Sequence, residues 1–170
     1  MDTFKEYIVK KELTQSEKIS RICIIVASIA LAFFFIAITL GTVLMMFGII
    51  FAGLSVYFGW QIITRFFVEY EYIVTNSDLD IDKITNQSKR KRLCTVDLHK
   101  VSECGKYSGN VTISEDETLI QASANNSELD DYYLRFTHKT FGNAVLIFTP
   151  SIEVLELIQQ FFPRTVKKLI

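Results

Sequence analysis

An uncharged block near the start of the chain constrains its fold more than any other feature. Between Arg21 and Arg65 lie 43 consecutive residues without Asp, Glu, Lys, Arg or His, whereas the remaining positions hold 18 basic and 19 acidic residues. A helix needs about 20 residues to cross the roughly 30 Å of hydrocarbon in a bilayer. The block is long enough for two crossings, so we expect two transmembrane helices.

A glycine near the middle of the block marks the expected turn between these helices. Gly41 tolerates the backbone angles of a tight turn, and a turn at 39–42 leaves spans of suitable length at 22–40 and 43–63. A buried hairpin in a soluble core would carry a polar stripe, and a cleaved signal peptide would have a shorter apolar region nearer the terminus. We therefore expect a membrane-spanning helical hairpin.

The basic residues predict the orientation of the hairpin, because Lys and Arg concentrate on the cytoplasmic side of membrane spans. They flank both spans and are absent from the turn: Lys5, Lys10, Lys11, Lys18, Arg21, Arg65, Lys83 and the run 89–92. We expect a multi-pass protein of the cell membrane with both termini in the cytoplasm. Glycosylation triplets begin at Asn86, Asn110 and Asn125, but they would matter only if the polar part were exported in a eukaryote.

Small residues recur four positions apart in both spans, a spacing that lets helix backbones approach closely in lipid. The pairs are Ala37 with Gly41, Gly48 with Ala52, and Ser55 with Gly59. We expect these faces to join the two helices, and contact with a second copy in a homo-oligomer is the alternative. The block holds no charged residue, so it lacks the usual mark of an ion pathway.

The first twenty residues are predicted to be a segment that approaches the membrane. Thr3 with Glu6, and Thr14 with Glu17, have the spacing of a capping box at a helix start, and the second box would open the first span. Apolar side chains within 4–8 suit a short amphipathic turn on the membrane surface.

After Phe67 the apolar residues alternate with polar ones, as in EYEYIVTNSDLDIDKI at 69–84, and this period of two indicates β-strands. We expect antiparallel strands at 69–75, 78–84, 91–98, 101–107, 111–114, 118–124, 132–138 and 143–149. A helix at 150–162 should follow, with Thr149 as its N-cap, and should cover the open mouth of the sheets. The fold class is α+β, with residues 1–67 as the membrane part and 68–170 as a cytoplasmic β domain.

Parts of this pattern resemble a known family. The series Tyr72-Ile-Val-Thr-Asn, then Leu79-x-Ile81, a basic run at 89–92 and the stretch from Thr95 to Val101 resemble bacterial pleckstrin-homology-like (PH-like) domains that follow paired membrane spans. The closest likeness is to a family of small, uncharacterised two-span proteins. The resemblance implies a seven-stranded barrel-like sandwich capped by the C-terminal helix, and it implies no activity, because fold alone does not give function.

Eukaryotic relatives of the fold often bind inositol phosphates through basic residues in the loop between the first two strands. We expect that loop at 75–78, where the residues Thr-Asn-Ser-Asp include no basic side chain. The resemblance therefore does not carry inositol phosphate binding over to this chain.

The strongest charge feature is a basic run formed by Lys89, Arg90, Lys91 and Arg92. Such a run gains roughly 1 kcal/mol per basic residue near an anionic leaflet. The preceding strand offers cross-strand partners worth about 0.2 to 1 kcal/mol each, namely Asp78, Asp80 and Asp82. Structural pairing with these aspartates and contact with lipid or a partner are both open, and we favour pairing.

No pattern indicates a catalytic, metal or cofactor site. The Asp-x-Asp-x-Asp series has Lys83 and Lys89 where a calcium loop needs Gly and Glu, and the two histidines, His99 and His138, lack a ligand partner at metal spacing. A pairing of Cys104 with His99 would lack an orienting third group. We expect a protein that is not an enzyme and uses no cofactor.

The net charge limits the kind of partner, and the cysteines indicate the kind of compartment. The formal net charge is −1, which gives no bulk attraction to nucleic acid. Cys23, Cys94 and Cys104 have no CxxC spacing, which suits a reducing compartment without a disulfide framework.

The prediction for function is a non-enzymatic membrane-anchored module that presents a surface for a protein partner, one mode being an open sheet edge that adds a peptide strand. Two alternatives stay open: an accessory subunit recognised through its spans, and a module that binds anionic lipid.

Overall fold

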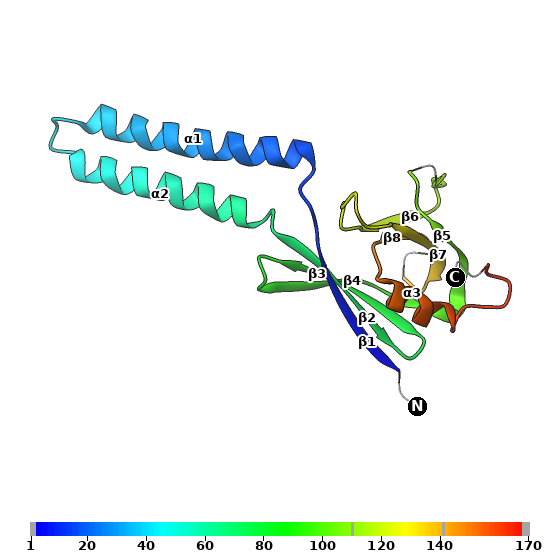
Figure 1. Cartoon of the computed structure of the whole chain (residues 1–170). Helices are drawn as coiled ribbons and strands as arrows, with labels where there is room; N and C mark the ends of the chain where they lie inside the picture. Colours follow the sequence, from blue (N-terminus) through cyan, green and yellow to red (C-terminus); the bar gives the residue numbers. More distant parts are fainter. Residues whose placement is uncertain (1–2, 110, 141, 168–170) are drawn as a thin grey trace. The chain divides into compact units, whose positions relative to one another are not determined.

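The computed structural model describes residues 3–109, 111–140 and 142–167 (Figure 1). The chain forms two compact units. One is the helical segment Leu13–Phe67, and the other joins the residues up to Glu12 with those from Val68 onward. The helical segment is therefore inserted into the β unit rather than placed before it. Asn110, which begins one of the glycosylation triplets, lies outside the described residues.

Two helices make up the inserted segment: α1 (Gln15–Thr39) and α2 (Met45–Thr64). The predicted capping box at the start of α1 is confirmed, since the Thr14 amide donates to the Glu17 carboxylate at 2.9 Å. By length and composition both helices are candidate membrane spans. In the most apolar 18-residue window of each helix, the buried share of the residues is 0% for α1 and 17% for α2. Helix α1 begins seven residues before the expected start of the first span, and α2 begins two residues after the expected start of the second.

Small residues on α2 bring the two helices together. A Cβ atom added at Gly59 would lie 2.7 Å from the Ser28 Cβ, and one at Gly48 would lie 2.9 Å from a carbonyl oxygen of α1. Ser55 Oγ also donates to the Ser28 carbonyl at 3.3 Å. Gly48, Ser55 and Gly59 thus lie where the two helices meet, and Ala52 on the same helix is buried.

The packing prediction is wrong for Gly41. This residue lies in the turn with a positive φ, and its Cβ position is open. It therefore serves the turn, where a glycine adopts the left-handed backbone without strain, rather than a helix contact. Ala37, its predicted companion, is exposed on α1.

The first sheet is antiparallel, in the order β1-β2-β3-β4. Its strands are β1 (Phe4–Lys10), β2 (Val68–Thr75), β3 (Asp78–Thr85) and β4 (Lys89–Asp97). Strand β1 overturns the expected approach segment and the capping box at Thr3, because FKEYIVK alternates as a strand does. It pairs with β2 from Phe4 opposite Thr75 to Lys10 opposite Glu69.

The second sheet has the order β5-β7-β8-β6 and follows a 3₁₀ turn, η1 (Leu98–Lys100). Its strands are β5 (Val101–Lys106), β6 (Thr118–Ala122), β7 (Tyr132–His138) and β8 (Gly142–Phe148). Strand β6 pairs with β8 in parallel, so the all-antiparallel expectation is wrong there. No strand forms at 111–114, and the described residues hold eight strands in place of the seven implied.

The core lies between the inner faces of the two sheets, and helix α3 (Ile152–Gln159) contributes Val154, Leu155 and Ile158 to it. The helix is capped by Ser151, whose Oγ accepts a hydrogen bond from the Val154 amide at 3.3 Å. The predicted cap at Thr149 is therefore wrong, and a serine fills the same role two residues later.

Thr149 instead belongs to a buried polar cluster that closes the β unit. Its hydroxyl donates to Asp131 at 2.5 Å and accepts from the Ala124 amide at 2.8 Å, and its own amide donates to Tyr72 Oη at 3.1 Å. Burial raises the pKa of Tyr72, which stays a neutral donor to the Ala122 carbonyl. The Glu12 amide donates to the Ala124 carbonyl at 2.7 Å, so the chain after β1 is fixed to the same cluster.

Candidate functional site

The basic end of the first sheet is the strongest candidate for a functional site. This is the end where the chain leaves β1 for the helical segment and returns to β2: the Lys11 amide donates to the Val68 carbonyl at 2.9 Å. Val68 lies opposite Thr85, which in turn lies opposite Lys89. One row, from the residue that follows β1 through β2 and β3 to β4, therefore ends at the basic run.

A tight turn places the basic run in register with β3. Asn86 and Gln87 both have positive φ, as the primed turns that fit the twist of a hairpin require. The Ser88 amide donates to the Thr85 carbonyl at 3.3 Å, and strand β4 begins at the next residue.

A β-bulge in β4 decides which way each basic side chain points. Ile81 lies opposite Cys94, but the next residue, Asp82, lies opposite Arg92, so Leu93 is the extra residue of the bulge. Beyond the bulge the side chains alternate between the two faces of the sheet. Arg90 and Arg92 share the outer face with Asp82, and we call this pair the arginine face.

The arginine face is occupied by ion pairs with carboxylates of β2 and β3, of which Glu71 and Asp82 are buried. Arg92 contacts Asp82 through Nε and Asp80 through Nη1, both at 2.6 Å, and Arg90 Nη2 lies 2.8 Å from Glu71 Oε1. The predicted cross-strand pairing is confirmed for Arg92, whereas Arg90 reaches across to β2. Asp78 lies opposite Asp97 and is not a partner of the run.

Glu71 is 0% exposed although it lies on the outer face of the sheet. Burial raises the pKa of Glu71, and the nearby Glu6 carboxyl group raises it further, while the Arg90 charge acts in the opposite direction. The two carboxyl groups belong to β1 and β2, the strands on either side of the inserted helices.

The other side chains of the basic run point to the opposite face, where Lys91 lies opposite Lys83 and Lys89 lies opposite Thr85. We call Lys83, Lys89 and Lys91 the lysine face. Among the residues that the structure describes, none of the three has an ion pair or a side-chain hydrogen bond, and Lys89 and Lys91 are exposed. Like charges directly opposite each other destabilise a sheet, so this face favours an anionic partner.

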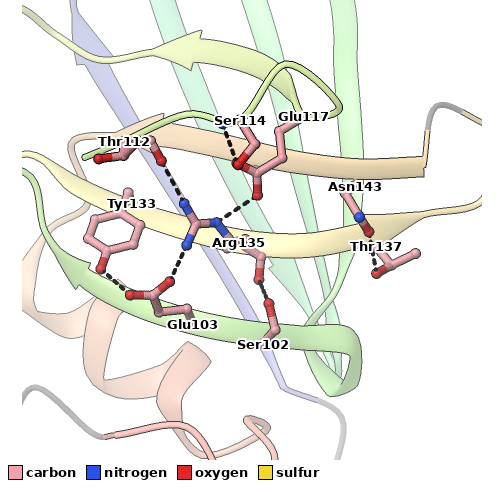
Figure 2. A network of polar contacts seen from close by, with 9 residues as sticks. All are labelled: Ser102, Glu103, Thr112, Ser114, Glu117, Tyr133, Arg135, Thr137 and Asn143. Carbon is pink, nitrogen blue, oxygen red and sulfur yellow. Dashed lines mark hydrogen bonds and ion pairs between the residues drawn. The ribbon is translucent and has the colours of Figure 1, made fainter.

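A second polar cluster, which the sequence did not single out, lies on the second sheet (Figure 2). Arg135 on β7 forms ion pairs with Glu103 at 2.5 Å and Glu117 at 2.7 Å and donates to the Thr112 carbonyl at 3.0 Å. The contacts hold the segment between β5 and β6 against the sheet, where a strand was expected at 111–114. Because Arg135 is shared between two glutamates and a backbone carbonyl, we interpret the cluster as structural. Alternation along β7 was its only sequence signal.

The remaining reactive side chains are not gathered into a site. Burial raises the pKa of Cys94 and of Cys104 to about 12, which leaves both as unreactive thiols. His138 Nδ1 accepts from the Thr140 amide at 3.1 Å. Within 3–109, 111–140 and 142–167, no three His, Cys, Asp or Glu side chains could hold a metal ion.

The two sheets, the closing helix and the paired apolar helices define the class of protein as a PH-like β unit with an inserted helical hairpin. The chain matches the family model described as bacterial PH-like domain (DUF6106) over residues 1–168, and it belongs to that family. The match covers the helices as well as the strands. No curated protein and no solved structure matches the chain.

Proposed function

We propose that the chain is a non-enzymatic membrane-anchored PH-like module whose lysine face contacts anionic lipid head groups. Helices α1 and α2 form the anchor in this proposal, and both termini lie in the cytoplasm. Binding of a protein partner and recognition through the spans stay predictions.

The observation that carries the proposal is the division of the basic run between two faces. The arginines neutralise buried carboxylates, whereas Lys83, Lys89 and Lys91 are left for an external anion. At roughly 1 kcal/mol per residue, three lysines supply on the order of 3 kcal/mol near an anionic leaflet.

The position of the lysine face along the sheet supports the same proposal. Three residues, 65–67, connect α2 to β2, and such a connection extends over at most about 14 Å. Lys89 is two strands away from Val68, or about 10 Å at the usual strand spacing. The covalent connection thus limits how far the lysines can lie from the end of the proposed span.

The connection between the first two strands is not the one that the sequence predicted. The first strand is β1, so this connection is 11–67 and not the acidic turn at 75–78. Basic residues flank the true connection at both ends: Lys10, Lys11, Lys18, Arg21 and Arg65. The lack of basic residues at 75–78 is therefore no argument against an anion at this end of the sheet.

Lysine acetylation of the full chain in nanodiscs tests the proposal. We expect acetylation of Lys89 and Lys91 to fall about fivefold when phosphatidylglycerol replaces part of the phosphatidylcholine, as roughly 1 kcal/mol per lysine implies. Mass spectrometry reads each lysine separately. High salt should remove the protection, because it shortens the Debye length.

Lys100 and Lys139 are internal controls in the same molecule. They line a cavity with Asp78 and Asp97, at the opposite end of β3 and β4. Their acetylation should not depend on the lipid. Equal acetylation of Lys89 and Lys91 in both lipids, or protection of all four lysines alike, would contradict head-group contact by the lysine face.

A further inference from the structure

The first turns of α1 carry a groove that shares no residue with the lysine face. It has a volume of about 230 Å³ and is lined by Lys18, Arg21, Ile22 and Ile25. These residues follow each other at helix positions i, i+3, i+4 and i+7, so they share one face of α1. The charged pair comes first along the chain, and the apolar pair lies within the uncharged block.

Arg21 is held in place within this groove. Its guanidinium carbon lies 5.1 Å from the centre of the Phe67 ring, a cation–π contact that fixes the side chain. Its Nε atom is buried, and no residue in the described part of the chain accepts a hydrogen bond from it. Buried donors usually have an acceptor, so Arg21 keeps one donor without a partner among the described residues, and a phosphate is an acceptor of suitable charge.

The two ends of the groove differ in chemistry. Lys18 and Arg21 suit a phosphate, since a guanidinium offers several donors in a plane to its oxygens. Ile22 and Ile25 are 61% and 42% exposed, respectively, and provide apolar contacts for a hydrocarbon chain. A free phosphate ion would use only the first pair of residues.

We infer that this groove binds one anionic phospholipid, with its phosphate at Lys18 and Arg21 and the start of an acyl chain along Ile22 and Ile25. The inference rests on the proposed membrane location of α1. It differs from simple anchoring of basic side chains at the bilayer surface, because it requires the oriented Nε donor of Arg21.

Native mass spectrometry of the full chain, released from detergent micelles, tests the inference. We expect the wild-type protein to retain one phosphatidylglycerol and little phosphatidylcholine. The double variant K18Q/R21Q should lose the retained lipid about fivefold or more. Inorganic phosphate at the same concentration should not displace the lipid, since it lacks the acyl contact.

Two further variants separate the groove from other sources of binding. Arg21→Lys keeps the charge but removes the Nε donor, so it should also lose the lipid, and its conservative nature protects the fold. K100Q/K139Q removes two positive charges outside both proposed lipid sites, so it should retain the lipid as the wild type does, whatever the outcome of the acetylation test on the lysine face. Equal retention by wild type, K18Q/R21Q and Arg21→Lys, or equal retention of both lipids, would overturn the inference.

Discussion

Glu71 has the most unfavourable environment of any acidic residue on the first sheet. It has no exposed surface, one of its oxygens pairs with Arg90, and the other is buried without a hydrogen-bond partner among the described residues. Glu6 and Asp82 add negative charge nearby. Burial and this charge outweigh Arg90, so the folded protein holds a proton on Glu71 more tightly than an unfolded chain does.

This raised pKa predicts a pH dependence of stability. Because the folded state binds the extra proton, the contribution of Glu71 is fully present below its ordinary pKa of 4.5 and is lost as pH rises through the higher folded value. Thermal unfolding of the full chain and of Glu71→Gln in micelles should therefore show the wild type losing stability relative to the variant as pH increases above 4.5. A relative gain over that range would mean that the Arg90 ion pair dominates.

The orientation of the basic run could be predicted only in part. The sequence indicated pairing of the run with Asp80 and Asp82, and Arg92 makes both contacts. The bulge at Leu93 decides which basic residues pair with the aspartates. Without the bulge, Leu93 would lie opposite Asp82, and Lys89 and Lys91 would point to the same face as Asp82. A bulge depends on tertiary packing and leaves no reliable mark in the sequence.

Among the elements, β1 was the least predictable from sequence. Its partner β2 lies more than fifty residues away along the chain, beyond two helices, so no local hairpin signal joins them. The later strands were predicted well because turn residues separate neighbours, as Asn76 with its positive φ does between β2 and β3. Parallel pairing of β6 with β8 is equally non-local and was missed.

Strand β1 should be necessary for a stable β unit. It supplies the buried Val9, and its Tyr7 ring lies 6.1 Å from that of Tyr72. A chain in which Asn-Gly replaces residues 12–67 and so joins Lys11 to Val68 should fold, since these two residues already pair across neighbouring strands.

Residues 68–170 alone provide the comparison. They should be less stable by about 2 kcal/mol or more, the order expected for exposing one buried Val and its neighbours, or should aggregate through the free edge of β2. Urea unfolding followed by circular dichroism measures the difference. Equal midpoints for the two chains would contradict a structural role for β1.

At the scale of the whole molecule, the insertion restricts how many times the proposed anchor can cross a membrane. Because β1 and β2 pair along their full length, both ends of the inserted segment must lie on the same side of a membrane. An even number of spans meets this requirement, and the segment holds two candidate helices. The length of the uncharged block predicted the same number independently.

Cysteine labelling in intact bacterial cells tests this insertion most directly. Cys23 is replaced by Ala, and a single Cys is introduced either at Val43, which is fully exposed in the turn, or at Ser88 in the β3–β4 turn. The buried Cys94 and Cys104 should not react, since their raised pKa of about 12 keeps them as thiols.

We expect a membrane-impermeant maleimide to label the Val43→Cys protein in intact cells and the Ser88→Cys protein only after permeabilisation. The protein with Cys23→Ala alone gives the background. Labelling of both positions in intact cells, or of neither until the cells are permeabilised, would contradict a two-span hairpin inserted into a cytoplasmic β unit.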